Sequence, residues 1–437
     1  MPDRDKSPQL VEAAALRRKR PAPAGWARNG FIAALDVGTT KVSCLIARMV
    51  GSAPVVVGVG HRASRGLRSG TFVDLDGAEA AVRATVEAAE RMAGENIRHV
   101  IVNVSAGNPR SRLMAYEVSV GGHEIDDADL RRILDSASIG QAEADGCEVV
   151  HAIPVGYSID GCRGVRDPRG MFGQRLGVSL HMITAARGAL RNLNACIDRC
   201  HLEIADKVVS SYASALGCLV EDETALGVTL IDMGGGTTSL AVFFDGELIH
   251  TDAITIGGIH VTKDIARVLS TPLAQAERMK TLFGSCLPSP SDDRQVIEIP
   301  PMGEEGAGEL SQVPRSLLVN VIRSRLEETF EMLRARLEDA GLSRMAGRRV
   351  VLTGGASQVP GAPELASMIL DKQVRIGRPR PMKGLPEAAY GPGFSTCAGL
   401  LRYAVNHPHQ GDTTTYRPAD TPVSRLSRLG QWLRENF

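Results

Sequence analysis

The sequence predicts an α/β protein whose core consists of two similar halves. One pattern occurs twice, at residues 36–41 and again at residues 232–238: an aspartate, then glycines and threonines. Each copy follows a short apolar run and continues into a second β-rich run. Such a pattern favours a strand, a glycine-rich turn and a second strand. Because both copies lie in matching strand contexts, we expect one strand–turn–strand unit in each half.

The composition of the two turns is suited to phosphate. Glycine removes the Cβ that would keep backbone N–H groups away from phosphate oxygens. The aspartate at the strand end is then left to face a hydrated Mg²⁺ ion, which prefers oxygen ligands. Two such turns that face each other would hold one nucleotide from both sides.

A third segment, residues 349–357, has the sequence RVVLTGGAS, which predicts a buried strand that ends in a Gly-Gly turn. A turn of this kind lets the backbone lie against a flat adenine ring. In their order and spacing, the three segments resemble the phosphate-1, phosphate-2 and adenosine motifs of the superfamily that contains actin, sugar kinases and heat-shock chaperones. The alternative is three ordinary strand–turn junctions of an α/β protein.

Length and composition set the broad class. A chain of 437 residues suggests about three domains with several hydrophobic cores. The formal net charge is zero, so no overall field favours nucleic acid as a partner. The eight cysteines include no Cys-x-x-Cys pair, which favours buried thiols in a reducing cytoplasm over zinc or disulfides. The sequence shows no signal peptide or membrane-spanning apolar stretch, so we expect a cytosolic chain.

The first half follows a tail, residues 1–30, whose Pro, Ala and charged residues predict disorder. Strands, one amphipathic helix and a further strand are predicted in order at 31–35, 42–47, 55–63, 76–93 and 100–105. Residues 106–182 depart from this alternation. They predict a capped helix and three strands, at 126–139, 149–153, 157–160 and 176–183, and therefore a small inserted α+β domain. A helix at 190–200 returns to the core.

The second half repeats the scheme from residue 226. Residues 285–314 contain five prolines and predict a mobile loop around a single strand, 295–299. A long helix is predicted at 315–337. Residues 407–421 are polar, with two further prolines, and predict a linker.

The last residues of the chain predict a short amphipathic helix behind that linker. At about 100° per residue, its apolar side chains fall within a sector of roughly 140°: Leu426, Leu429, Trp432, Leu433 and Phe437. Arg428 and Arg434 lie on the opposite face, and Arg425 near the boundary can snorkel. This pattern favours a reversible anchor at an anionic membrane surface, strengthened when polymers carry many copies. The alternative is a helix that docks onto the protein's own core.

Together, these features resemble the FtsA family of actin-like bacterial cell-division proteins, from about Phe31 to Phe437. The resemblance implies an actin-like core, a duplicated ribonuclease H-like fold, with an inserted IC domain. The first-half subdomain IA would comprise residues 31–105, 183–224 and 395–406, and IC residues 106–182. The second half would comprise IIA, 225–260 and 348–394, and IIB, 261–347. The linker would span 407–423 and the membrane-targeting helix 424–437.

The resemblance also implies ATP and Mg²⁺ as ligands. Asp36 and Asp232 would hold Mg²⁺ through water, and Lys41 would neutralise phosphate charge. Glu277 and Lys280 would contact ribose and adenine, or else form an exposed i,i+3 ion pair. The phosphate-binding and adenosine-binding residues would be Gly38, Thr39, Thr40, Gly234, Gly235, Gly236, Thr237, Thr238, Gly354, Gly355 and Ala356.

The same resemblance implies partners and a location. Arg325 and Glu328, one helical turn apart, would hold the C-terminal tail of FtsZ; the alternative is a pair of solvated charges. The protein would polymerise on the cytoplasmic face of the inner membrane at the division septum. It would tether FtsZ filaments there and recruit later division proteins through the IC domain.

The sequence predicts weak or absent ATP hydrolysis. Hydrolysing members of the superfamily place a carboxylate or amide near the start of the helix before the second phosphate turn. Here Ser210 or Ser211 takes that place, and a hydroxyl is a poor base. Ser210 is thus a candidate only for orienting water, and no catalytic residue is assigned. Alternatives are a scaffold of the MreB or pilus-assembly type and a small-molecule kinase, but a kinase needs an aspartate base in its substrate cleft.

Overall fold

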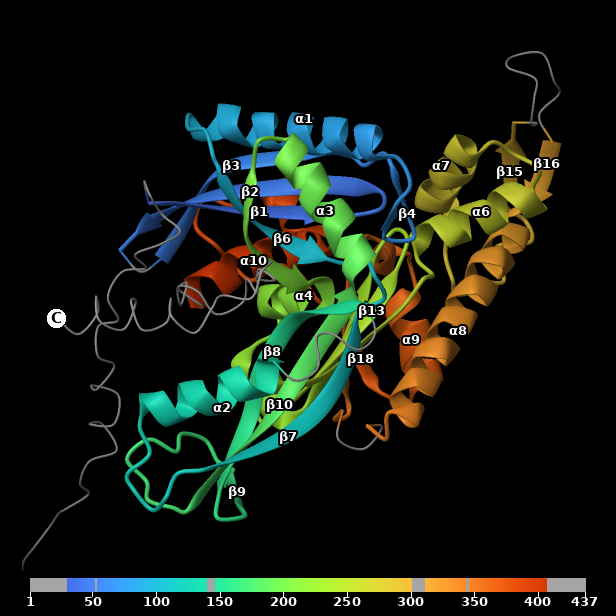
Figure 1. Cartoon of the computed structure of the whole chain (residues 1–437). Helices are drawn as coiled ribbons and strands as arrows, with labels where there is room; N and C mark the ends of the chain where they lie inside the picture. Colours follow the sequence, from blue (N-terminus) through green and yellow to red (C-terminus); the bar gives the residue numbers. More distant parts are fainter. Residues whose placement is uncertain (1–29, 52, 140–145, 301–310, 343–345, 407–437) are drawn as a thin grey trace, which may run out of the picture.

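The computed structural model describes residues 30–51, 53–139, 146–300, 311–342 and 346–406 (Figure 1). The predicted tail, linker and terminal amphipathic helix, with its eight proposed membrane-contacting residues, lie outside the described residues. Within the described ranges, no helix is long and apolar enough to cross a membrane.

The first half contains a five-stranded sheet in the order β11-β6-β1-β2-β3. Its strands are β1 (Phe31–Val37), β2 (Lys41–Val50), β3 (Ala53–Ala63), β6 (His99–Val104) and β11 (Glu203–Val209). Helices α1 (Leu75–Ala93) and α3 (Arg187–Arg199) bury their apolar residues in one core with this sheet. A short hairpin, β4 (Leu67–Arg68) and β5 (Thr71–Phe72), precedes α1.

The second half repeats this topology, with its sheet in the order β14-β13-β12-β17-β18. Its strands are β12 (Val228–Met233), β13 (Thr238–Phe244), β14 (Glu247–Ile254), β17 (Arg349–Thr353) and β18 (Gln373–Ile376). In each half the first strand is antiparallel to the second and parallel to the fourth, and its aspartate lies opposite a serine, Ser43 or Ser239. The predicted duplication is therefore confirmed at the level of strand register.

Helices and a small hairpin complete the second half. Its core contains residues of α6 (Gly258–Val268), α7 (Leu273–Phe283), α8 (Arg315–Asp339) and α9 (Ala362–Leu370). The strand predicted at 295–299 is β15 (Val296–Ile299), and it pairs with β16 (Ser311–Pro314), which the sequence analysis missed.

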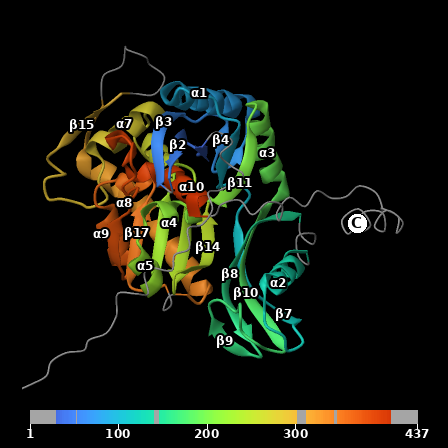
Figure 2. The ribbon, with the colours of Figure 1, turned by 90° about the vertical axis from the view of Figure 1, so that its left-hand side faces the viewer.

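The inserted domain is a four-stranded antiparallel sheet, in the order β7-β10-β8-β9, with one helix (Figure 2). Its elements are β7 (Arg110–Ser119), α2 (Asp127–Ile139), β8 (Cys147–Ile159), β9 (Cys162–Val165) and β10 (Arg175–Ala186). The prediction of separate strands at 149–153 and 157–160 was wrong. β8 is continuous because the irregularity around Pro154 is accommodated by a register shift opposite Ser179 and Leu180.

Two helices lie in the core shared by the two halves: α4 (Ser210–Cys218) and α10 (Ser395–Asn406). They pack closely because glycines remove side chains at the contact. A Cβ at Gly399 would lie 1.7 Å from the Ala213 carbonyl oxygen, and one at Gly217 would lie 2.2 Å from that of Ser395. The remaining short elements are α5 (Glu221–Leu226), η1 (Gly355–Gln358), η2 (Glu387–Ala389) and η3 (Pro392–Phe394).

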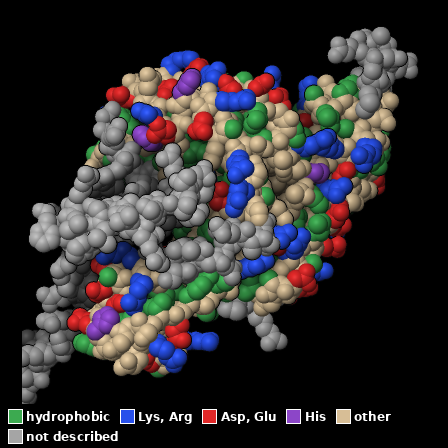
Figure 3. Space-filling model, in the orientation of Figure 1, with side chains coloured by type: hydrophobic (Ala, Val, Ile, Leu, Met, Phe, Trp, Pro, Cys, Tyr) green, Lys and Arg blue, Asp and Glu red, His purple; other side chains and the backbone are tan. Residues whose placement is uncertain are grey.

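The described surface carries charges of both signs. On the face drawn in Figure 3, basic and acidic side chains are interspersed over the described residues rather than gathered by sign. This distribution agrees with a formal net charge of zero.

Candidate functional site

A cavity of about 330 Å³ lies between the two halves. This volume is at the lower end of the range of small-molecule sites, roughly 300–1,000 Å³. The cavity is lined by the β1–β2 turn, the β12–β13 turn, the turn after β17 and the segment before α10. Lining residues that the sequence analysis proposed are Asp36, Gly38, Thr39, Thr40, Lys41, Ser210, Asp232, Gly234, Gly235, Gly236, Thr237, Gly354 and Gly355.

The two hairpin turns have the same internal geometry. Gly38 N donates to the Lys41 carbonyl at 3.0 Å, and Gly234 N donates to the Thr237 carbonyl at 2.9 Å. A Cβ at either glycine would lie 2.9 Å from the same accepting oxygen, so both positions favour glycine. The sequence repeat is thus a repeat of backbone structure.

The hairpins also touch each other across the cavity. A Cβ at Gly235 would lie 2.5 Å from Thr40 Oγ1, and one at Gly236 would lie 2.5 Å from Thr39 Oγ1. Thr39 Oγ1 accepts a hydrogen bond from Gly70 N at 3.0 Å, which fixes the threonine. The glycines of the second hairpin therefore allow the first to approach.

Asp36 and Asp232 both line this cavity and are both buried. Burial raises the pKa of Asp36 to about 7, against the opposing effect of Lys41, and the charge of Asp232 adds to the rise. Burial also raises the pKa of Asp232, while hydrogen bonds from Ser214 and Thr396 oppose that rise. The Asp36 carboxylate accepts no hydrogen bond from another described residue. Two buried carboxylates at one cavity fit a cation, which would remove the cost of burying their charge.

The side chain of Lys41 contacts the segment before α10, which forms another part of the cavity lining. Its Nζ donates to the Gly393 carbonyl and lies 3.9 Å from the centroid of the Phe394 ring. Burial lowers the pKa of this lysine. The role of Lys41 in neutralising phosphate remains a prediction. Gly393 and Phe394 were missed, although the Gly-Pro-Gly run at 391–393 is a turn signal.

The turn after β17 approaches Asp232 directly. Gly354 has φ of +86°, and a Cβ there would lie 2.4 Å from Asp232 Oδ1. A Cβ at Gly355 would meet nothing within 4 Å, so this part of the backbone faces open space. A flat ring could lie against it.

Some of the proposed ligand residues do not line the cavity. The side chain of Thr238 is buried and donates to the Ile256 carbonyl at 2.8 Å. Ala356 packs against the core of the second half. Glu277 Oε2 accepts from Lys280 Nζ at 2.7 Å and also from Thr262. Lys280 in turn donates to the Gly258 carbonyl at 3.2 Å, next to the second hairpin.

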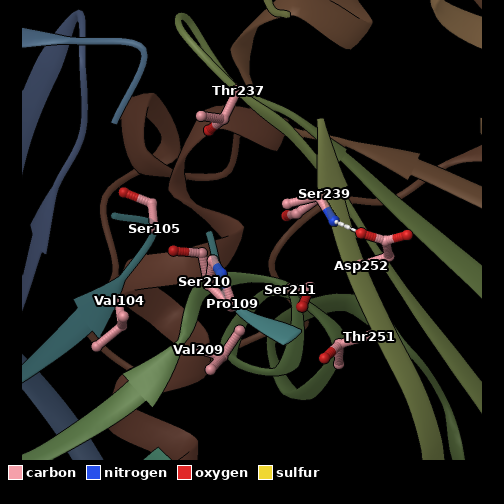
Figure 4. A pocket seen from close by; sticks show the side chains of 11 residues that line it. Val104, Ser105, Pro109, Val209, Ser210, Ser211, Thr237, Ser239, Thr251 and Asp252 are labelled. Atoms are coloured by element: carbon pink, nitrogen blue, oxygen red, sulfur yellow. Dashed lines mark hydrogen bonds between the residues drawn. The ribbon is translucent and has the colours of Figure 1, made fainter. Parts of the chain in front are cut away.

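The serines at the start of α4 line a smaller cavity of about 10 Å³ (Figure 4), and Ser210 also lines the main cavity. Ser210 Oγ accepts from Asn103 Nδ2 at 3.1 Å, and Asn103 Oδ1 accepts from Val37 N at 2.7 Å. Among the described residues, the buried hydroxyls of Ser211 and Thr251, which also line the smaller cavity, have no hydrogen-bond partner. A volume of this size holds about one water molecule. Asn103 was missed because nothing in its local sequence marks it.

Arg325 and Glu328 lie on α8, away from the cavity. Arg325 Nη1 is 2.5 Å from Glu328 Oε2, and Arg325 Nε is 2.5 Å from Asp264 Oδ2 on α6. The two side chains form an ion pair with each other, and Asp264, which the sequence analysis missed, is a second partner of the arginine. Their contact with the FtsZ tail stays a prediction.

Two family models match the chain. The model described as "Cell division protein FtsA" matches residues 229–399, and the model described as "SHS2 domain inserted in FTSA" matches residues 106–184. The Cell division protein FtsA of Agrobacterium fabrum is 46% identical, over 95% of this chain and 97% of the relative. That of Pseudomonas aeruginosa is 36% identical, over 93% of this chain and 98% of the relative. That of Escherichia coli is 31% identical, over 93% and 98%.

Solved structures show the fold independently. A PilM–PilN type IV pilus biogenesis complex matches with a TM-score of 0.61 and 15% identity, over 86% of this chain and 98% of the other. MreB5 of Spiroplasma citri bound to ADP matches with a TM-score of 0.52 and 15% identity, over 87% of this chain and 98% of the other. The predicted actin-like class with an inserted domain is confirmed.

Proposed function

The chain belongs to the FtsA family of cell division proteins, and we propose that it binds ATP with Mg²⁺ between its two halves and tethers FtsZ filaments to the inner membrane. The observation that carries the nucleotide proposal is the pair of matching hairpins, whose aspartates line one cavity. Glycines at the hairpin turns give phosphate oxygens access to backbone N–H groups. The MreB5 structure with ADP has the same fold and supports an adenine nucleotide.

Within this site, Asp36 and Asp232 would hold a hydrated Mg²⁺ ion, which would neutralise phosphate charge. The first hairpin, Gly38 to Lys41, would cradle phosphate together with Gly234 to Thr237. Gly354 and Gly355 would support the adenine, with Ala356 behind them. The two cavity-lining carboxylates, Asp36 and Asp232, are both assigned to the cation. Ser210 can only orient water, so we expect nucleotide to act as a structural ligand with slow or absent turnover.

The membrane and partner roles rest on other features. The sequence pattern of residues 424–437 supports a peripheral anchor at the cytoplasmic face of the inner membrane. Arg325 and Glu328 present charge on α8 to the FtsZ tail. Self-polymerisation would multiply the weak anchor through effective concentration, and the inserted domain would contact later division proteins.

The test is liposome flotation of the intact chain beside a chain that ends at Thr421, each with ATP and FtsZ. We expect the intact chain to carry FtsZ to the lipid fraction and the shortened chain to leave it in the soluble fraction. Equal recovery of both chains with lipid would refute the anchor. Nucleotide binding is tested separately by titration of both chains with a fluorescent ATP analogue, where both should bind equally because the shortened chain keeps the whole cavity.

A further inference from the structure

The carboxylate of Asp232 is held by two hydroxyl groups, whereas that of Asp36 is not. Ser214 Oγ donates to Asp232 Oδ2 at 2.6 Å. Thr396 Oγ1 lies 3.3 Å from the same oxygen and 2.9 Å from Ser214 Oγ. Asp232 Oδ1 accepts no hydrogen bond from the described residues, and the turn at Gly354 lies against it. Of the two carboxylate oxygens, Oδ2 is thus engaged by hydroxyl groups and Oδ1 by none of the described donors.

The two hydroxyls reach Asp232 from the two helices in the core shared by the halves. Ser214 is on α4 and Thr396 is on α10, while Asp232 is the residue before the last of β12 in the second half. Ser214 is fully buried, and Thr396 and Asp232 are each only 8% exposed. Because α4 and α10 meet backbone to backbone at Gly399, the hydroxyls have little freedom to move. The contact therefore fixes the carboxylate relative to both halves.

Two donors on one oxygen set the direction of a carboxylate. Hydrogen bonds to an ionised acceptor are roughly twice as strong as neutral ones, and they favour the charged form of the acid. Hydrated Mg²⁺ requires nearly ideal octahedral geometry, so it is sensitive to the orientation of each oxygen that contacts its water shell. Groups that orient a ligand in this way commonly affect metal affinity by about 10–100-fold.

We propose that Ser214 and Thr396 are positioning residues that hold the Asp232 carboxylate in the orientation in which it would contact the hydrated cation of the bound nucleotide. This inference rests on the proposed nucleotide site. It adds two residues that would make the affinity for nucleotide depend on magnesium. Both hydroxyls contact the aspartate; Thr396 also lines the cavity, and Thr396→Val removes its hydroxyl while keeping its volume. Their loss should therefore weaken binding of the magnesium complex and spare binding of nucleotide without metal.

The experiment measures affinity for a fluorescent ATP analogue in excess MgCl₂ and again in EDTA, on full-length protein. The variants are Ser214→Ala and Thr396→Val, which remove one hydroxyl each, and Thr396→Ser, which keeps it. Ser395→Ala is the matched control, since Ser395 is buried on the same helix but hydrogen-bonds Thr353 at 2.7 Å rather than Asp232. Thermal unfolding of each variant confirms that it is folded.

In MgCl₂ we expect Ser214→Ala and Thr396→Val to bind about tenfold more weakly, since each loses a hydrogen bond to a charged group. Thr396→Ser and Ser395→Ala should bind like the unchanged chain, and in EDTA all five chains should bind alike. Equal weakening in both buffers, or none in MgCl₂, would overturn the inference while leaving the nucleotide site standing. Absence of nucleotide binding by the unchanged chain would overturn both.

Discussion

Arg325 on α8 is bound to Asp264 on α6 as closely as to Glu328 on its own helix, at 2.5 Å from each carboxylate. The arginine side chain is only 25% exposed, so its charge is largely committed within the second half. A partner that uses Arg325 must compete with Asp264. The proposed contact of Arg325 with the FtsZ tail therefore depends on how firmly the Asp264 carboxylate holds the guanidinium.

Exchange of Arg325 for Glu should weaken binding of an FtsZ tail peptide by at least about tenfold, because an attractive charge becomes a repulsive one. Asp264→Asn should strengthen binding by a few-fold, since it frees the guanidinium. The measurement is fluorescence anisotropy of the labelled peptide. Arg334→Glu, farther along α8, is the control. Unchanged affinity for Arg325→Glu would rule out the assignment.

Affinity for the magnesium–nucleotide complex should rise with pH and level off above about 7. Burial raises the pKa of Asp36 to about 7, so below that pH the carboxyl is protonated and neutral, and a proton competes with the cation. One displaced proton corresponds to about a tenfold change in affinity per pH unit below the pKa. Titrations of nucleotide binding at pH values from about 5.5 to about 8.5, which bracket the pKa of Asp36, check this. Asp36→Asn should reduce the rise and leave the part that comes from Asp232, whose pKa burial also raises. An unchanged rise in this variant would contradict the assignment.

Gly236→Ala should weaken nucleotide binding by at least about tenfold. Its Cβ would lie 2.5 Å from Thr39 Oγ1 and 2.9 Å from the Cα of Ser69, which is backbone and has little room to yield. Overpacking of this kind costs about 1–3 kcal/mol. In this case it would push the two hairpins apart. Gly188→Ala on α3 is the control, because a Cβ there meets nothing within 4 Å. Equal affinities for the two variants would mean that contact between the hairpins is unimportant.

Acid should destabilise the junction between the inserted domain and the second half. His181 on β10 is fully buried, and burial lowers its pKa to about 4, with the nearby His250 adding to the effect. Because the unfolded chain takes up this proton near pH 6.5, stability is retained above that pH and lost as pH falls toward 4.

For His181→Leu, the loss of unfolding free energy between pH 7 and pH 5 should be about 2 kcal/mol smaller than for the unchanged chain. Chemical denaturation at the two pH values gives this difference. His201→Asn is the control, because His201 is an exposed turn residue at φ +59°, a conformation that Asn tolerates. An unchanged pH dependence in His181→Leu would exclude this histidine as the cause.

The sequence was most informative where the signal is local. Asp36 and Asp232 could be identified because each lies in a short run whose strand, turn and glycines are contiguous. Ser214 and Thr396 could not, since Thr396 is separated from Asp232 by 164 positions and only the fold brings them together. Asn103, 66 positions from the backbone amide it holds, was missed for the same reason.

The missed strands have different causes. In β7 the partly buried Met114, Tyr116 and Val118 recur at every second residue, so its alternation was readable, but arginines and an exposed Leu113 obscured it. β16 is only four residues long and contains Pro314, so its propensity is low. It forms because β15 supplies a partner, which is a tertiary effect.

The inserted domain also closes an open edge. β14 is the last strand of its sheet, and its Thr251 N donates to Ser111 Oγ of β7 at 3.0 Å, while the same hydroxyl meets His250 Nδ1 at 3.1 Å. A chain that lacked residues 106–184 would lose this contact and expose the unpaired edge of β14, Thr251 N included, as a template for aggregation. Loss of division activity in such a deletion would therefore report on solubility as much as on any missing binding partner, and point substitutions on the outer face of the insertion are the sounder genetic tool.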